Sequence, residues 1–473
     1  MSSTIRTPKI FEVIIVLLLF FMIMILSTAV YDIPLQLAML VVWFLFIGYG
    51  LYLGYTYNHL QKAIADGIHS GIEATLVLTV VGGVIGTWIA GGIVPTMIYY
   101  GLQIIHPNIF LLATLFICAI TSLTIGTAWG TVGTAGLAMM AVGESFGMPA
   151  GIIAGAIISG ATFGDKLSPL SDTTVMTASL GKIDVMEHVR SMLWVSLPAF
   201  VISGILFTVA GIFYVDKKSI DLTIVQGNMQ VLDDYFNIAW YMLIPMVVVL
   251  ILLMMKKPAI PTLSLGILMG VVWAWLFQGM DFIAAFTTAY TGLGEEVGIK
   301  FLDGIIGAGG IYSMFDVILF VILALGFGGL LQELKILQYV TDLLDKWIKR
   351  STGRLTISTL LASFAGNLFG GANYVALITG VKSTEGNHER LGVKKSVMTR
   401  NTEIGGTLTG SMIPWTENGM FYPAILGVAT LSYLPFMWVA FLSIIITIIY
   451  GYTGKGIWYE EGRQANAAND IEK

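Results

Sequence analysis

The stretch that decides the fold class is Gly160-Ala-Thr-Phe-Gly-Asp-Lys-Leu-Ser-Pro-Leu-Ser-Asp-Thr-Thr174, which places three charged side chains inside an otherwise apolar region. Pro169 cannot donate a hydrogen bond to the carbonyl of Asp165 and clashes with it, so a helix should open at this point. Broken backbone survives at membrane depth only where it lines a cavity or is buried in protein. The stretch therefore predicts a broken transmembrane helix with a polar interior site.

The composition around this stretch indicates an all-α polytopic membrane protein. Of the 473 residues only 11% are charged and 56% are hydrophobic, whereas soluble domains average about 25% charged residues. The mean hydropathy is +0.84, and Ala74–Gly143 carries no Asp, Glu, Lys or Arg at all. Continuous apolar runs disfavour an outer-membrane barrel, whose strands alternate. The net charge of −5 and the apolar composition exclude a nucleic-acid binder, a soluble enzyme and a disordered chain.

The N-terminus is predicted to be a membrane span and not a cleaved signal. Ile10–Met24 is an apolar run behind Arg6 and Lys9, and a second run, Ile33–Leu53, follows at once. Basic residues remain on the cytoplasmic side, so we expect the N-terminus inside a bacterial cytoplasmic membrane. The lone Cys118 permits no internal disulfide and no cysteine metal site. Because no nucleophile–base or metal-ligand spacing occurs, we expect neither an enzyme nor a bound cofactor.

The chain contains a weak internal repeat. When the sequence is aligned with itself at an offset of 245 residues, Gly160–Asp172 aligns with Gly405–Glu417. The carboxylates of Asp172 and Glu417 then occupy the same position. Loop charge then predicts that the repeats are inverted. For example, Gly92–Pro107 has no Lys or Arg, whereas its counterpart Glu333–Arg354 has five, and loops rich in Lys and Arg stay cytoplasmic. Inverted repeats are typical of secondary transporters.

Each repeat is predicted to have five crossings, one of them a broken helix, plus a re-entrant hairpin. The crossings are expected at 10–29, 33–55, 71–91, 150–181 and 191–214, and at 238–255, 260–278, 303–332, 401–426 and 436–453, with hairpins at 109–142 and 355–380. This divides the chain into a first repeat (1–214), an external linker (215–237), a second repeat (238–455) and a cytoplasmic polar tail (456–473). If the hairpins cross fully, ten crossings become fourteen.

The candidate ion site lies at the two breaks and the two hairpin tips. Carboxylates, hydroxyls and opened carbonyls are the ligands that hard cations prefer, and charges inside a span are costly enough to indicate function. The candidates are Asp165, Ser168, Ser171, Asp172 and Thr173 in the first break, Thr416, Glu417 and Asn418 in the second, Thr127, Thr131, Asn367 and Asn373 at the hairpin tips, and Pro169 and Pro414 as helix breakers.

Several alternatives, in which these residues have no part in ion binding, compete with this hypothesis. Asp165 and Asp172 are seven residues apart, about 10.5 Å along an unbroken helix, so they can share one Na+ only if the break brings them together. The charged stretch could instead be a solvated surface loop, Glu417 could simply pair with Lys166, and threonine hydroxyls in helices often bond back to their own backbone.

Lys166 has two predicted roles. A lone ammonium at membrane depth costs at least about 2.5–3.5 kcal/mol, so it should pair with Asp165 or Glu417 when no cation is bound and release that carboxylate when Na+ or H+ arrives. Alternatively, its long side chain snorkels to the cytoplasmic face and takes no part in transport.

Gly160–Thr174 resembles the signature of the NhaC family of bacterial Na+/H+ antiporters, and Gly86–Thr96 and Gly126–Thr134 are similar to its other landmarks. The resemblance implies a cytoplasmic-membrane antiporter of the wider ion-transporter superfamily and points to Asp165, Ser168, Ser171, Asp172 and Thr173. Two stretches depart from the family pattern. Val175-Met-Thr177 stands where many members have Asn-Leu-Ala, and Pro414-Trp-Thr-Glu-Asn-Gly419 stands where many have Pro-Trp-Asn-Thr-Cys-Gly.

Two functions follow as hypotheses. The first is Na+/H+ antiport by alternating access, because a buried carboxylate can hold either a proton or Na+ and so enforces exchange. The alternative is a malate/lactate-type organic-acid exchanger coupled to H+ and Na+, to which one branch of the family is similar. It would bind anions through half-helix N-termini, Lys166, and Asn373 or Asn418, although Glu417 would repel a carboxylate unless a cation screens it. A channel or receptor is less favoured. The expected partners are membrane lipid, small ions or small carboxylates, and a second copy in a homodimer.

Overall fold

The computed structural model describes residues 5–31, 33–70, 72–169, 171–214, 222–255, 257–294, 297–307, 309–336, 347–348 and 351–460. Over these residues the fold is all-helical, apart from an isolated antiparallel bridge between Val393 and Tyr459. The predicted tail beyond Glu460 lies outside the described residues.

The described residues of the first half form eleven α-helices. They are α1 (Ile10–Ile25), α2 (Leu35–Tyr52), α3 (Tyr57–Ser70), α4 (Ile72–Ala90), α5 (Ile93–Ile104), α6 (Phe110–Ile125), α7 (Ala128–Thr131), α8 (Leu137–Ser145), α9 (Ala150–Leu167), α10 (Asp172–Gly181) and α11 (Val185–Tyr214). The helix that was expected over 191–214 begins earlier, at Val185, so most of the predicted loop before it is helical.

The second half continues with α12 (Leu222–Tyr235), α13 (Ile244–Met254), α14 (Ala259–Phe277), α15 (Phe282–Thr291), α16 (Lys300–Ile306), α17 (Phe315–Glu333), α19 (Thr352–Gly370), α20 (Asn373–Leu391), α21 (Lys395–Gly410), α22 (Glu417–Leu426), α23 (Thr430–Tyr433) and α24 (Trp438–Thr453). Helix α12 occupies most of the described part of the predicted linker, and α15 is a helix that the sequence analysis did not name.

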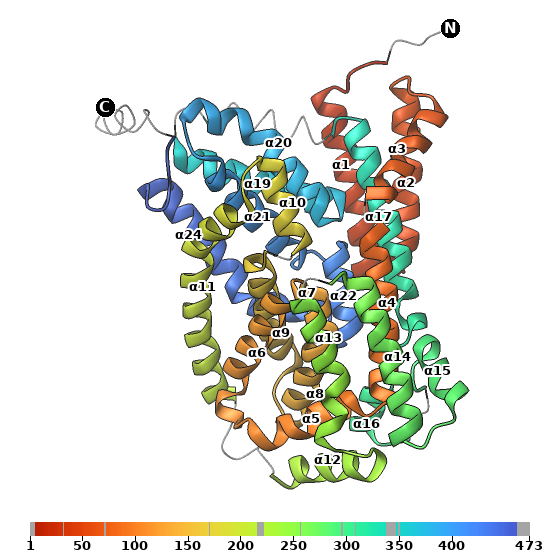
Figure 1. Cartoon of the computed structure of the whole chain (residues 1–473). Coiled ribbons are helices and arrows are strands. Elements are labelled where there is room, and N and C mark those ends of the chain that lie inside the picture. Colours follow the sequence, from red (N-terminus) through yellow and green to blue (C-terminus); the bar gives the residue numbers. More distant parts are fainter. Residues whose placement is uncertain are drawn as a thin grey trace.

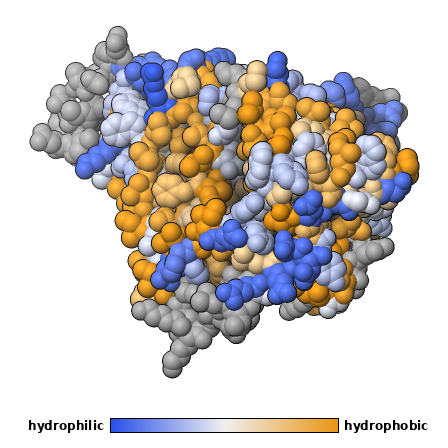
Figure 2. All heavy atoms as spheres, turned by 60° about the horizontal axis from the view of Figure 1, so that its bottom comes forward, coloured by the Kyte–Doolittle hydropathy of each residue, from blue (hydrophilic) through white to orange (hydrophobic). Residues whose placement is uncertain are grey.

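The helices identify a multi-pass membrane protein. Among the described residues, five helices are long and apolar enough to cross a membrane, and the number rises to eight if three bent helix pairs each count as one span. Figure 2 shows broad apolar patches on the flank of the molecule, with polar side chains along its top and across the lower part of the view. On α11, for example, Trp194, Val201 and Phe213 are exposed, as expected for a lipid-facing helix. The division into ten crossings stays a prediction.

Two groups of helices pack side by side, and each group draws on both halves of the sequence (Figure 1). One group contains α1–α4, α14, α15 and α17, in which α4 contacts α14 and α15 while α17 contacts α2 and α3. The approach is close: a Cβ on Gly86 of α4 would lie 2.4 Å from the carbonyl oxygen of Thr288 on α15. The other group contains α6, α9–α11, α19–α21 and α24.

The chain reverses direction at two glycines. Gly126 follows α6 with φ +80°, and Gly371 follows α19 with φ +70°, a left-handed conformation that glycine adopts without steric cost. These residues are 245 positions apart, which is the offset of the repeat expected from the sequence. In Figure 1, α6 and α8 occupy the lower half of the molecule, α19 and α20 lie in the upper half, and α7 and α22 lie between them.

Candidate functional site

The first helix break separates α9 from α10. Helix α9 ends at Leu167, two residues before Pro169, and Ser168 is extended with φ −83° and ψ 122°. The Ser171 side chain caps α10 by accepting a hydrogen bond from the backbone N–H of Thr174. The Thr174 hydroxyl in turn lies 3.3 Å from the carbonyl oxygen of Lys166. The helix therefore opens where the sequence predicts, and hydroxyl groups occupy the opening.

The three charged residues of this break have different surroundings. The side chains of Asp165 and Lys166 are buried, with 5% and 1% of the residue surface exposed, whereas Asp172 is exposed. Oδ2 of Asp172 accepts a hydrogen bond from the Tyr374 hydroxyl at 2.6 Å, and its Oδ1 accepts one from the backbone N–H of Thr173. Within the described part of the chain, Oδ1 of Asp165 and Nζ of Lys166 make no hydrogen bond.

Neither predicted role of Lys166 describes this conformation. Its ammonium makes no hydrogen bond to Asp165 or Glu417, so the expected hydrogen-bonded pair is not formed here. Its burial also contradicts snorkelling to a solvent-exposed face. The side chain remains inside the protein because α9 is almost completely covered around its C-terminal end.

The second break separates α21 from α22 and is tied to the second hairpin tip. Its N-cap Thr416 donates to the carbonyl of Gly410 at 2.5 Å and accepts from the N–H of Gly419. The backbone N–H of Glu417 donates to the Gly371 carbonyl at 2.8 Å, and Oε1 of Glu417 accepts from the backbone N–H of Asn373 at 2.8 Å. Pro414 lies inside this break, between the two helices. Glu417 is therefore hydrogen-bonded to the hairpin tip. The alternative prediction, an ion pair between Glu417 and Lys166, is wrong for this conformation.

Side-chain amides surround the second break. Nε1 of Trp129, from the first hairpin, donates to Oδ1 of Asn418 at 2.6 Å. Nδ2 of Asn418 lies 3.4 Å from Oδ1 of Asn373. A Cβ at Gly410 would lie 2.6 Å from that same Asn373 oxygen, so any larger residue there would displace the Asn373 amide. Asn367 donates to the Gly406 carbonyl at 2.5 Å. The tips and breaks of both halves therefore meet in one polar region.

The hairpin-tip threonines lie apart from this network. The Thr131 hydroxyl donates to the carbonyl of Thr127 at 3.0 Å. It thus bonds to the backbone of its own helix, as threonine hydroxyls in helices often do. Thr127 lines an apolar pocket of about 130 Å³ together with Trp88 and Met246. The amides of Asn367 and Asn373 are thus better placed in the polar region than the two threonines.

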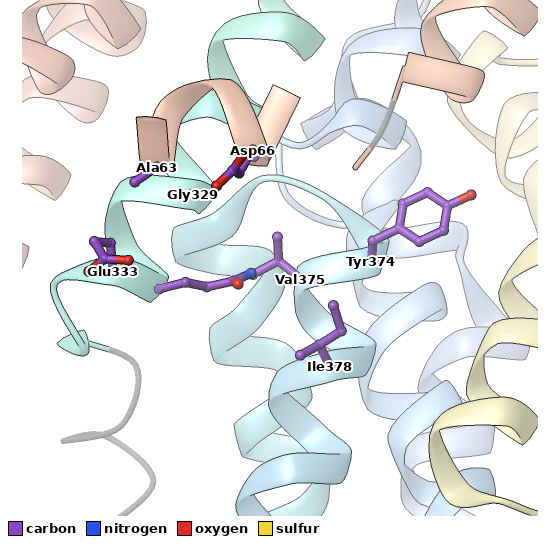
Figure 3. A pocket seen from close by; sticks show the side chains of 9 residues that line it. Ala63, Asp66, Gly329, Glu333, Tyr374, Val375 and Ile378 are labelled. Atoms are coloured by element: carbon purple, nitrogen blue, oxygen red, sulfur yellow. The ribbon is translucent and has the colours of Figure 1, made fainter. Parts of the chain in front are cut away.

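A second pocket, of about 370 Å³, adjoins the first break. Helices α3, α17 and α20 line it, and Asp66, Glu333 and Tyr374 contribute its polar groups. Figure 3 shows Tyr374 near the start of α20, with its ring directed away from Val375 and Ile378. Because the Tyr374 hydroxyl also binds Asp172, this residue joins the pocket to the break.

Three polar residues at or near the site were missed by the sequence analysis. Trp129 and Tyr374 are aromatic residues whose polar contacts depend on tertiary packing, and no local pattern indicates them. Glu403 is different, because it is a carboxylate inside the predicted crossing 401–426 and is fully buried. The rule that a charge within a span marks a functional site would have identified it.

The chemistry available at the breaks is that of a hard-cation or proton site. Among the described residues, no three His, Cys, Asp or Glu side chains gather closely enough to hold a metal ion. A cation at Asp165 would therefore complete its shell with hydroxyl and carbonyl oxygens, which the opened helix ends supply.

Opened helices with buried carboxylates, set in an apolar helical bundle, define a membrane transporter of small charged solutes. The chain belongs to the Na+/H+ antiporter family, whose model matches residues 2–190 and 160–455. It is 51% identical over 463 residues to the malate-2H(+)/Na(+)-lactate antiporter of Bacillus subtilis (strain 168), covering 98% of both chains.

Two NhaC proteins are also similar. The Na(+)/H(+) antiporter NhaC of Alkalihalophilus pseudofirmus is 37% identical over 89% of this chain and 90% of its own length. The NhaC of Bacillus subtilis (strain 168) is 34% identical over 86% of this chain and 89% of its own. These matches confirm the resemblance to the NhaC family, and they identify the chain as a transporter.

Proposed function

We propose that this chain exchanges Na+ for H+ across the bacterial cytoplasmic membrane, with the ions bound at the first helix break. The observation that carries the proposal is Asp165, a buried carboxylate with one oxygen that no hydrogen bond satisfies within the described residues. An ionised carboxylate is costly to bury without a partner. Asp165 therefore requires either a proton or a cation, and this competition produces antiport.

The proposed Na+ ligands lie on both sides of the break. Asp165 supplies a buried carboxylate, and Ser168, Ser171 and Thr173 supply oxygens next to it. Asp172 is exposed and bonded to Tyr374, so we assign it the first contact with the incoming cation, through the pocket that Tyr374 lines. Glu417 retains one oxygen without a hydrogen bond, and it contributes with Thr416 and Asn418 from the second break.

A specific observation favours a small hydroxy acid as a further cargo. The amides of Asn373 and Asn418 and the indole of Trp129 form a cluster of neutral polar groups beside the N-termini of α20 and α22, and half-helix N-termini suit carboxylate groups. The printed name of the 51% identical relative includes malate and lactate. Because Glu417 lies beside the amides, the acid would enter together with Na+ or H+, which screens that carboxylate.

The remaining assignments follow from this transport cycle. We place both termini in the cytoplasm and treat the two halves as inverted repeats, which the lower and upper positions of the two hairpins support (Figure 1). Transport of this kind needs no cofactor besides the transported ions. We also expect a homodimer in a lipid bilayer.

One experiment tests both parts. The purified protein is reconstituted into liposomes, and uptake of radioactive Na+ is driven by an outward proton gradient, with or without malate or lactate inside. Na+ uptake that requires the proton gradient supports antiport, and further stimulation by an internal acid supports the second cargo. Absence of gradient-driven Na+ uptake under all these conditions contradicts the proposal. Asp172→Asn should lower uptake, and liposomes without protein serve as the negative control.

A further inference from the structure

A second buried carboxylate lies outside the proposed Na+ site. Glu403, in the middle of α21, is fully buried. Its Oε1 is 2.8 Å from the hydroxyl of Thr407, and its Oε2 contacts the hydroxyl of Thr177 on α10. Nε2 of His188, on α11, lies 3.9 Å from the same Oε2, too far for a hydrogen bond.

These contacts have the pattern of a neutral carboxylic acid. The Thr177 hydroxyl has one proton and lies 2.7 Å from the carbonyl oxygen of Thr173, which can only accept. When Thr177 donates to that carbonyl, the proton in its contact with Glu403 must come from the carboxyl group. The other oxygen of Glu403 then accepts from Thr407. A protonated carboxyl has one donor and one acceptor oxygen, so the two hydroxyls satisfy both.

The groups around Glu403 include the buried ammonium of Lys166, which no hydrogen bond holds in place among the described residues. The titratable side chains shown to interact with Glu403 are Asp165 and Lys166 from α9 and His188 from α11. On α21 itself, Arg400 is directed away, with its guanidinium donating to the Gly456 carbonyl at 2.8 Å. Lys166 lies within electrostatic reach of both Glu403 and Asp165 but makes no hydrogen bond among the described residues.

We propose that Glu403 binds the exchanged proton, and that Lys166 moves between Glu403 and Asp165 so that the proton and Na+ exclude each other. This inference rests on the proposed Na+/H+ exchange. When Glu403 is protonated, it no longer attracts Lys166, which can then move from its present position without hydrogen bonds to Asp165 and occupy the position that Na+ needs. When Glu403 loses its proton, the carboxylate attracts Lys166, and Asp165 is free to bind Na+.

Helix α10 connects the two sites mechanically. Thr177 on this helix contacts Glu403, and Ser171, which caps its first turn, hydrogen bonds to the side chain of Asp165. Packing holds the far end of the helix firmly against α21, where a Cβ on Gly181 would lie 2.2 Å from Thr399. A change at Glu403 is therefore transmitted through one rigid element to the Na+ site.

The test separates Na+ binding from proton coupling. Na+/Na+ counterflow in proteoliposomes requires no proton, whereas Na+ uptake driven by a proton gradient does. Glu403→Gln mimics the protonated acid, because its amide can donate to Thr177 and accept from Thr407, so the fold should be kept. Lys166 then stays at Asp165, and we expect counterflow to fall by about tenfold or more. Adding Lys166→Gln should restore counterflow to the double variant, while gradient-driven uptake stays lost.

Each outcome has a clear meaning. Unchanged counterflow in Glu403→Gln, or reduced counterflow that Lys166→Gln does not restore, overturns the assignment of Glu403. Restoration of both counterflow and gradient-driven uptake in the double variant also overturns it. Absence of counterflow in the unmodified protein overturns the proposed function itself. Glu385→Gln is the matched control, since Glu385 is a carboxylate paired with Lys395 at 3.1 Å on the protein surface, and both assays should remain unchanged.

Discussion

The two helix breaks lie 245 positions apart, the offset of the repeat predicted from the sequence, but they are held very differently. At the second break, Glu417 is fixed by two hydrogen bonds to the hairpin tip, one through its backbone and one through its side chain. Nε1 of Trp415 in the same break donates to the Leu368 carbonyl at 2.8 Å. At the first break, Asp165 and Lys166 are buried, and Oδ1 of Asp165 and Nζ of Lys166 have no hydrogen-bond partner among the described residues. Asp172 is exposed.

This difference indicates a division of labour. Backbone hydrogen bonds between a break and a hairpin are costly to lose when they are buried, so the second break serves as a fixed platform. Unsatisfied charges and an exposed carboxylate are features of a site whose occupancy changes. We therefore assign the exchanging carboxylate to the first break. The second break is the fixed part of the site, from which Glu417, Thr416 and Asn418 complete the ion surroundings. The following substitutions test that assignment in order of expected effect.

Asp165→Asn should have the largest effect. It removes the buried carboxylate of the first break and with it the proposed Na+ site. We expect gradient-driven Na+ uptake to fall by about a hundredfold, the upper end of the losses seen when partners of an ion site are removed. The control is Asp281→Asn, because Asp281 caps α15 away from the breaks and asparagine is also a good cap. Undiminished uptake in Asp165→Asn would contradict the assignment.

Glu417→Ala should mainly reduce stability. The substitution leaves the buried N–H of Asn373 without its acceptor, which costs about 1–3 kcal/mol. Glu417→Gln keeps a carbonyl oxygen at the same place and should be much less destabilising. Thermal denaturation of the detergent-solubilised protein measures the difference. Equal melting temperatures for the two variants would show that the hairpin does not depend on this hydrogen bond.

Gly410→Ala should disturb the amide cluster. Its new Cβ would lie 2.6 Å from Oδ1 of Asn373 and 3.1 Å from Nδ2 of Asn418. Overpacking of this kind costs about 1–3 kcal/mol, and we expect malate or lactate transport to suffer more than Na+ transport. Gly386→Ala is the matched control, because a Cβ at Gly386 of α20 meets no atom within 4 Å. The measurement is the ratio of acid uptake to Na+ uptake. A ratio equal to that of the control would show that the amide cluster does not bind the acid.

Tyr374→Phe should have the smallest effect. It removes one hydrogen bond to Asp172 at an exposed position, worth about 0.5–1.5 kcal/mol. The apparent KM for Na+ should therefore rise a few-fold while the maximal rate is kept, in contrast to Asp165→Asn. Tyr290→Phe, on exposed α15, provides the control. A loss of maximal rate as large as that of Asp165→Asn would mean that Tyr374 takes part in more than cation entry.

The sequence predicted the elements whose causes are local. Pro169 opens its helix because it lacks an N–H, and the apolar composition requires helices that satisfy their own backbone in lipid. The contacts of Asp172 with Tyr374 and of Asn418 with Trp129 join residues about 200 to 290 positions apart, so no local pattern contains them. The surroundings of Lys166 were equally beyond prediction, because they depend on how α21 places Glu403 beside α9.

The close packing of α4 against α14 and α15 also has a consequence for how the protein is made. The glycine-containing face of α4 packs against α15, with Gly86 close to the Thr288 carbonyl. This contact can form only after α15, which ends at Thr291, has been synthesised. At about 5–20 residues per second, the ribosome needs on the order of ten seconds to proceed from α4 to α15. During this interval the glycine face of α4 lacks the helix that covers it in the finished protein.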